Sequence, residues 1–205
     1  MTRTLGTVAA VSLALLMLSG CHVTEDRQNG KKNVSIGTPF GSLKVNTNNT
    51  TDTSAIGLEA YPGSTPVADS DDKDGNAANV NMSFGSFHLG VKAAFFQTSD
   101  PQDKVLAFYR RDLGTHFGDV IECRGDQAVG KPAHTSQGLT CGTTRDKHYV
   151  QLGSELSGKN VELRTGSEHH QHIVTVENHE GGTKIGLVVL DLPSHLSGHD
   201  NNDSE

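Results

Sequence analysis

Three cysteines carry the most readily interpreted chemistry in this 205-residue chain. Cys123 and Cys141 lie in the body of the sequence with residues 124–140 between them, and we predict that they form a disulfide in an oxidising compartment. A redox or metal-binding pair is the alternative, but the spacing is far from C-x-x-C and no second ligand-spaced pair exists. Cys21 is left over, and an odd cysteine needs a separate role.

The second group with chemical potential is a histidine cluster in residues 168–172. The chain holds 11 histidines, and this is the one place where they gather, at His169, His170 and His172. In a β-strand, His170 and His172 point to the same face, and two imidazoles on one face can share a transition metal. A third ligand would have to come from elsewhere, and the sequence offers three candidates: His148, His179 and Glu168. The competing interpretation is a polar hairpin end that leads into an apolar strand.

A calcium loop is a weaker possibility in residues 69–75. With Gly75 at loop position six, Asp72 and Asp74 stand where an EF-hand places its ligands, but Ser70 and Asn81 occupy positions one and twelve, where carboxylates are expected. A solvated acidic turn is the favoured interpretation of this segment. We therefore expect no cofactor, and weak binding of a transition metal or calcium is the possibility that the sequence leaves open.

Common catalytic signatures are missing from the sequence. Residues 125–131 match G-x-x-x-x-G-K, but Pro132 follows where a P-loop needs Ser or Thr, and no strand-to-helix pattern surrounds the match. The patterns G-x-S-x-G, G-x-G-x-x-G and H-E-x-x-H do not occur. We therefore predict no catalytic residue, and an enzyme that uses the histidines as acids, bases or metal ligands is the rival hypothesis.

The N-terminus has the features of an export signal. Arg3 precedes an apolar run over residues 5–18, which is shorter than the roughly 20 residues that a membrane-spanning helix needs. The run ends in Leu18-Ser19-Gly20-Cys21, which resembles the lipobox of bacterial lipoproteins. This resemblance implies that residues 1–20 are removed and that acyl chains on Cys21 anchor the protein to a membrane. His22 follows instead of the aspartate of an inner-membrane retention signal, so the outer membrane is favoured in a Gram-negative cell.

Four further segments, residues 38–41, 61–63, 79–87 and 105–111, resemble those of uncharacterised bacterial exported proteins and lipoproteins. The sequences are TPFG, YPG, NVNMSFGSF and VLAFYRR. The resemblance covers most of residues 34–123. It implies no catalytic residue, because the group has no assigned activity.

Composition and patterning predict one α+β domain. Hydrophobic residues make up 34% of the chain, and 24 acidic against 17 basic residues give no basic surface for nucleic acid. We expect a tether, a short hairpin at residues 34–45 and a polar linker within residues 21–55, then a single domain over residues 56–193 and a polar tail over residues 194–205.

The expected domain is a mostly antiparallel sheet of about six to eight strands with one amphipathic helix, residues 101–114, on one face. Asp100 is the expected N-cap of that helix, with Pro101 at its first position. Residues 79–97 alternate with period two and form two strands or one long bulged strand. Shorter strands are expected at residues 120–123, 148–152, 161–164, 172–177 and 185–190, of which the last is the most apolar and should be central.

These observations together predict a lipid-anchored protein of the bacterial cell envelope that acts as a binding or structural module. Its expected partners are the membrane, through the lipid on Cys21, and envelope proteins or a small ligand, but not nucleic acid. The alternative is an envelope metal-binding protein or an enzyme built on His169, His170 and His172.

Overall fold

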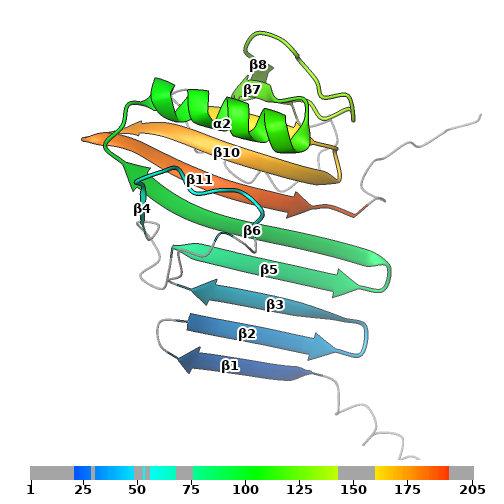
Figure 1. Cartoon of the computed structure of the whole chain (residues 1–205). Coiled ribbons are helices and arrows are strands. Elements are labelled where there is room, and N and C mark those ends of the chain that lie inside the picture. Colours follow the sequence, from blue (N-terminus) through cyan, green and yellow to red (C-terminus); the bar gives the residue numbers. More distant parts are fainter. Residues whose placement is uncertain are drawn as a thin grey trace, which may run out of the picture.

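The fold is an antiparallel β-sheet with a helix against one of its faces. In the computed structural model of the chain, the described residues are 21–28, 31–48, 53, 56–67, 76–142 and 160–193. They form an 11-stranded sheet, and the helix α2 (Gln102–Phe117) packs against its β9–β11 part (Figure 1). This is the predicted α+β architecture, with more strands than the six to eight expected.

The strand order places neighbours in sequence mostly side by side. The order is β1-β2-β3-β5-β6-β11-β10-β9-β7-β8, with β4 paired to the end of β6, and every pairing is antiparallel. The bounds are β1 His22–Gln28, β2 Lys31–Thr38, β3 Gly41–Asn48, β4 Thr65–Pro66, β5 Ala77–Phe84, β6 Phe87–Thr98, β7 Ile121–Arg124, β8 Gln127–Ala128, β9 Val161–Gly166, β10 His170–His179 and β11 Gly182–Asp191.

The N-terminal part of the sheet corrects the expected tether. Residues 22–33 are polar, yet β1 pairs with β2 along its whole length, from His22 opposite Gly37 to Gln28 opposite Lys31. The ladder is made by backbone groups, so a polar segment can join it wherever a neighbouring strand offers a free edge. Charged side chains on such an outer strand also discourage unwanted pairing with other chains. The expected hairpin at residues 34–45 is present and longer, as β2 and β3.

Two predictions about the centre of the sheet are confirmed. The alternating stretch at residues 79–97 forms two strands, β5 and β6, joined at Gly85, which has φ of 57°. The apolar run at residues 185–190 lies in β11, between β6 and β10. The turn before β11 requires glycine at position 182, because a Cβ there would lie 2.0 Å from the Thr98 carbonyl oxygen. The expected strand at residues 148–152 lies outside the described residues.

Helix α2 differs from the prediction at both ends. Its N-cap residue is Pro101, without a side-chain cap, and the Asp100 carboxylate instead accepts hydrogen bonds from Tyr61 Oη at 2.7 Å and Lys104 Nζ at 3.0 Å. At the other end the helix runs through Gly114 and stops at Gly118, which has φ of 91°. The extra turn carries Phe117, whose ring stacks on His172 of β10. A tertiary contact therefore outweighs the weak helix propensity of glycine.

The main core lies between α2 and the sheet. The helix buries Val105, Leu106, Tyr109 and Leu113 against strands β9, β10, β11 and β6. Residues 56–61 pack against one side of this core. The Tyr109 hydroxyl donates a hydrogen bond to the Glu59 carbonyl oxygen at 3.1 Å. The strand residues of this core are Ala94, Phe96, Val161, Leu163, Val174, Val176, Ile185, Leu187 and Val189.

The sheet has a second apolar face that α2 does not cover. Directly paired residues share a face, and the register joins Ile36, Leu43, Met82 and Leu89 in one row across β2, β3, β5 and β6. These side chains are only part-buried, whereas Leu187 on the helix face is fully buried. The two faces should therefore differ in how much each aliphatic side chain stabilises the fold.

We expect Leu187→Ala to lower the free energy of unfolding by about 2–5 kcal/mol, because it leaves a cavity under α2. The matched change Leu89→Ala removes a part-buried side chain and should cost less than about 1.5 kcal/mol. Urea unfolding followed by circular dichroism measures both. Equal losses would show that both faces are equally well packed.

Candidate functional site

Cys21 stands at the beginning of the sheet. It is exposed, it is the free cysteine among the described residues, and it directly precedes β1. Residues 1–20 lie outside the described residues. Within the described part of the chain, no helix is long and apolar enough to cross a membrane.

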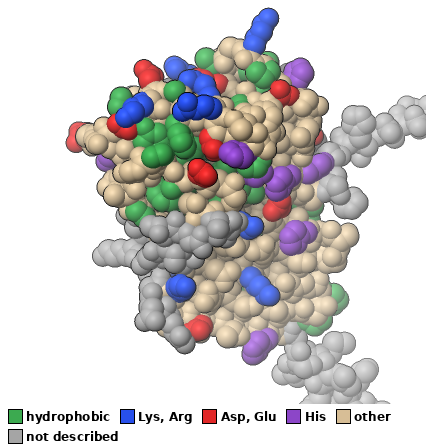
Figure 2. All heavy atoms as spheres, viewed as in Figure 1, with side chains coloured by type: hydrophobic (Ala, Val, Ile, Leu, Met, Phe, Trp, Pro, Cys, Tyr) green, Lys and Arg blue, Asp and Glu red, His purple; other side chains and the backbone are tan. Residues whose placement is uncertain are grey.

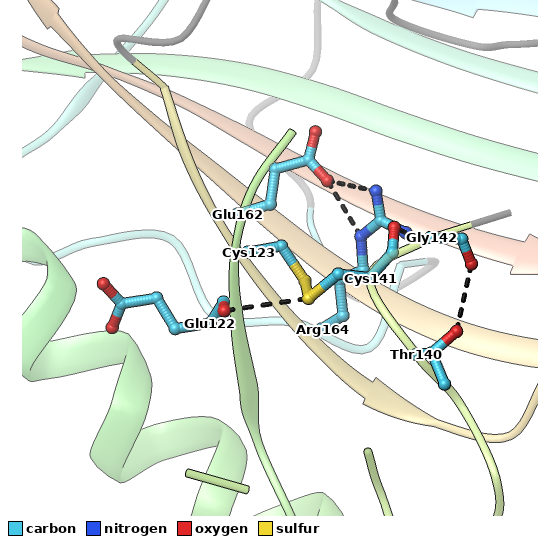
Figure 3. Close-up of a disulfide and its surroundings, with 7 residues drawn as sticks. All are labelled: Glu122, Cys123, Thr140, Cys141, Gly142, Glu162 and Arg164. Carbon is cyan, nitrogen blue, oxygen red and sulfur yellow. Dashed lines mark hydrogen bonds and ion pairs between the residues drawn. A yellow bond between two sulfur atoms is a disulfide. The ribbon is translucent and has the colours of Figure 1, made fainter. Parts of the chain in front are cut away.

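The other two cysteines form the predicted disulfide, with their Cα atoms 5.5 Å apart. It joins β7 to the loop that follows β8 (Figure 3). Both cysteines are buried in a small second core with Ile121 and Leu139. The guanidinium of Arg164 donates to the Cys141 carbonyl oxygen at 3.2 Å and pairs with Glu162 at 2.5 Å. The disulfide thus fastens the loop after β8 to the β9 side of the sheet.

His170 and His172 share one face of β10, with their ring centroids 4.9 Å apart. His172 is only 8% exposed and stacks on Phe117 with a centroid distance of 4.0 Å. Its buried Nδ1 has no hydrogen-bond partner among the described residues. His170 is exposed, and its Nδ1 hydrogen-bonds to the Asp191 carboxylate, which lies over Gly90.

The proposed third metal ligands do not join this pair. His179 lies at the opposite end of β10, where it pairs with Gly182, and Glu168 is an exposed turn residue. His148 lies outside the described residues, as does the acidic loop at residues 69–75. In the described ranges, no group of three His, Cys, Asp or Glu side chains could hold a metal ion.

Asp191 and Phe117 are the neighbours of the histidines that sequence reasoning missed. Asp191 could have been found, because a two-residue turn at Glu180 and Gly181 sets the β10–β11 register that places it opposite His170. Phe117 lies beyond the expected end of the helix, and no local signal connects it to His172.

Burial is the main influence on the charge of His172. It lowers the pKa of this imidazole below its usual value of 6.5; nearby His170 lowers it further, and Asp191 opposes both. The neutral ring is thus the form that packs against Phe117.

A separate hollow of about 380 Å³ lies between the C-terminal half of α2 and β7. Its lining includes Arg110, Glu122, Lys131 and Leu163 but neither His170 nor His172. Arg110 and Glu122 are engaged with each other, at 2.6 Å. The hollow and the histidine pair are therefore two distinct places.

No protein-family model, no curated protein and no solved structure matches this chain. The residues themselves are therefore the basis on which a function can be inferred.

Acidification should destabilise the protein partly through His172. Its pKa is lowered in the folded state, so below about pH 6.5 the unfolded chain takes up a proton that the folded chain resists, and stability falls as the pH falls. We expect His172→Leu to lose less stability than the parent between pH 7 and pH 5, measured by urea unfolding. His179→Gln, on the same strand but exposed, is the control and should behave as the parent does. Identical pH dependence of the parent and His172→Leu would contradict this reasoning.

Metal titration tests the histidine pair directly. Two imidazoles without a third described ligand should bind Zn²⁺ or Cu²⁺ no tighter than about 10⁻⁴ M at pH 7, which corresponds to roughly −5.5 kcal/mol. Calorimetry on the parent and on the His170→Ala/His172→Ala double variant should give the same weak signal. Tighter binding that the double variant loses, and that weakens at pH 5, would establish a metal site.

Proposed function

We propose that this chain is a lipid-anchored protein of the bacterial cell envelope that acts as a binding or structural module. The observation that carries the proposal is that the three cysteines differ in bonding and exposure. Cys123 and Cys141 are joined and buried, while Cys21 is free, exposed and placed directly before the first strand. That is the position at which an acyl-bearing residue would not disturb the fold.

The disulfide supports an exported location. Structural disulfides form and persist in oxidising compartments such as the periplasm and are rare in the cytosol. The apolar run at residues 5–18 and the lipobox-like sequence that ends at Cys21 supply a route to that compartment. Among the two envelope membranes, His22 after the cysteine favours the outer one.

A binding or structural role fits the described side chains better than catalysis does. Catalytic sites bring several titratable groups together in one pocket. Four charged side chains line the hollow beside α2: Arg110, Asp119, Glu122 and Lys131. Arg110 pairs with Glu122, and Asp119 accepts a hydrogen bond from the Ser136 amide, so these groups are engaged in contacts that hold the fold. Neither His170 nor His172 lies in the hollow. The broad sheet instead offers extended surfaces on which a partner could bind.

The anchor is joined to the fold without a spacer. β1 begins at His22, the residue after Cys21, and is hydrogen-bonded to β2 from that point. Acyl chains on Cys21 would therefore hold the edge of the sheet itself close to the lipid headgroups.

Replacement of Cys21 by Ser tests the anchor. We expect Cys21→Ser to lose labelling by radioactive palmitate and to move from the membrane fraction to the soluble fraction, because the acyl chains that would hold the protein on the bilayer can no longer be attached. The matched control is Cys123→Ala/Cys141→Ala, which removes two cysteines but should keep both the label and the membrane association. A Cys21→Ser protein that is still labelled and membrane-bound would refute the lipid anchor.

A further inference from the structure

One end of the sheet gathers the start of β1 and two hairpin turns. His22 pairs with Gly37 near the end of β2, and Gly41 at the start of β3 pairs with Phe84 at the end of β5. Phe84 in turn pairs with Phe87 across the next turn. Cys21 and residues 38–41 and 84–87 therefore lie at the same strand ends, on the right in Figure 1. We call this end the turn edge.

Exposed apolar side chains are concentrated at the turn edge. Four large hydrophobic residues are exposed in the described part of the chain, and three of them lie here or one residue inwards: Phe40 at 83%, Val23 at 62% and Phe84 at 43%. The fourth, Val129, follows β8 on the other side of the sheet. Figure 2 shows hydrophobic side chains projecting at the margin beside the β2–β3 turn.

The two turns are coupled by a close contact. A Cβ at Gly41 would lie 2.2 Å from Cδ1 of Phe84, so the Phe84 ring occupies the space beside the first turn. Thr38 holds that turn with its hydroxyl, which accepts from the Gly41 amide at 3.0 Å. Phe40 and Phe84 are thus presented together on two braced turns.

The two hairpins that end at the turn edge have no acidic residues near their turns. The chain has 24 acidic residues, but residues 34–45 and 79–91 contain none. The side chains in these two ranges that can carry a charge are those of Lys44 and His88. An anionic lipid surface could therefore approach the two turns without repulsion from carboxylates.

We propose that the turn edge inserts Phe40 and Phe84 into the interfacial region of the bilayer that holds the acyl chains of Cys21. This inference rests on the proposed lipid anchor and adds an orientation to it: the sheet stands on its turn edge, with its strands pointing away from the membrane. Aromatic and apolar side chains that project from turns enter the boundary between headgroups and acyl chains.

A lipid surface fits these residues better than a protein partner does. Phe40 and Phe84 project from hairpin tips and neither lines the hollow beside α2, whereas protein hot spots are typically pockets and packed centres. Their position at the same strand ends as Cys21 places them at the distance from the membrane where insertion is possible. A second copy of this chain is the main competitor.

The chain is well suited to a depth measurement. It contains no tryptophan, so one introduced tryptophan is the only indole, and the disulfide leaves Cys21 as the one free thiol for chemical coupling. The mature chain, beginning at Cys21, can be coupled to a maleimide phospholipid in phosphatidylcholine–phosphatidylglycerol vesicles. Lipids brominated on the acyl chains then quench tryptophans that enter the bilayer.

The test compares Phe40→Trp and Phe84→Trp with Glu180→Trp. Glu180 is an exposed turn residue at the opposite strand ends, roughly 30 Å away along strands of this length. We expect at least twofold quenching of both turn-edge tryptophans and none at position 180. Adding Phe84→Ser to Phe40→Trp should reduce the quenching, because the two turns insert together.

Several outcomes would overturn the proposal. Unquenched turn-edge tryptophans would show that the edge stays in water, and equal quenching at all three positions would show that the sheet lies in another orientation. Dimers in sedimentation without vesicles that Phe40→Ser/Phe84→Ser abolishes would assign the edge to a second copy. Since coupling to Cys21 is chemical, these results do not depend on lipidation in cells, which the Cys21→Ser experiment tests separately.

Discussion

The pairing of β6 with β11 is the interaction on which the rest of the structure depends. It pairs residues 90–98 of β6 with residues 183–191 of β11. In the described sheet it is the only connection between the half covered by α2 and the half formed by β1, β2, β3 and β5. The N-terminal half has no helix of its own in the described residues. The N-terminal strands are therefore held in place by backbone hydrogen bonds that lead to β6, which pairs with the buried strand β11.

Sequence patterning predicted the parts of the fold that local chemistry controls. Period two marked β5 and β6, the apolar run marked the central β11, and the cysteine count marked the disulfide. It failed for β1, because a charged segment that pairs only through its backbone has no side-chain signal. It also ended α2 at Gly114, since the contact between Phe117 and His172 is set by tertiary packing and not by the helix sequence.

The candidate site was only partly accessible to sequence reasoning for the same reason. The shared face of His170 and His172 follows from strand period alone. The carboxylate of Asp191 required the register of the β10–β11 hairpin, and the burial of His172 required the position of α2. The grouping of Phe40 and Phe84 with Cys21 required the order of the four strands β1, β2, β3 and β5, which no local pattern contains.

The ordered sheet begins at His22, the residue after Cys21, so that a lipid on Cys21, as proposed, would hold the sheet itself. Amide hydrogen exchange in residues 22–28 of the mature chain tests this most directly. Pairing with β2 predicts that alternate amides in β1 are protected while their neighbours exchange freely, because only every second residue of an antiparallel edge strand points its amide at its partner. Exchange of all these amides at the rate of an unstructured chain would show a tether and contradict the claim.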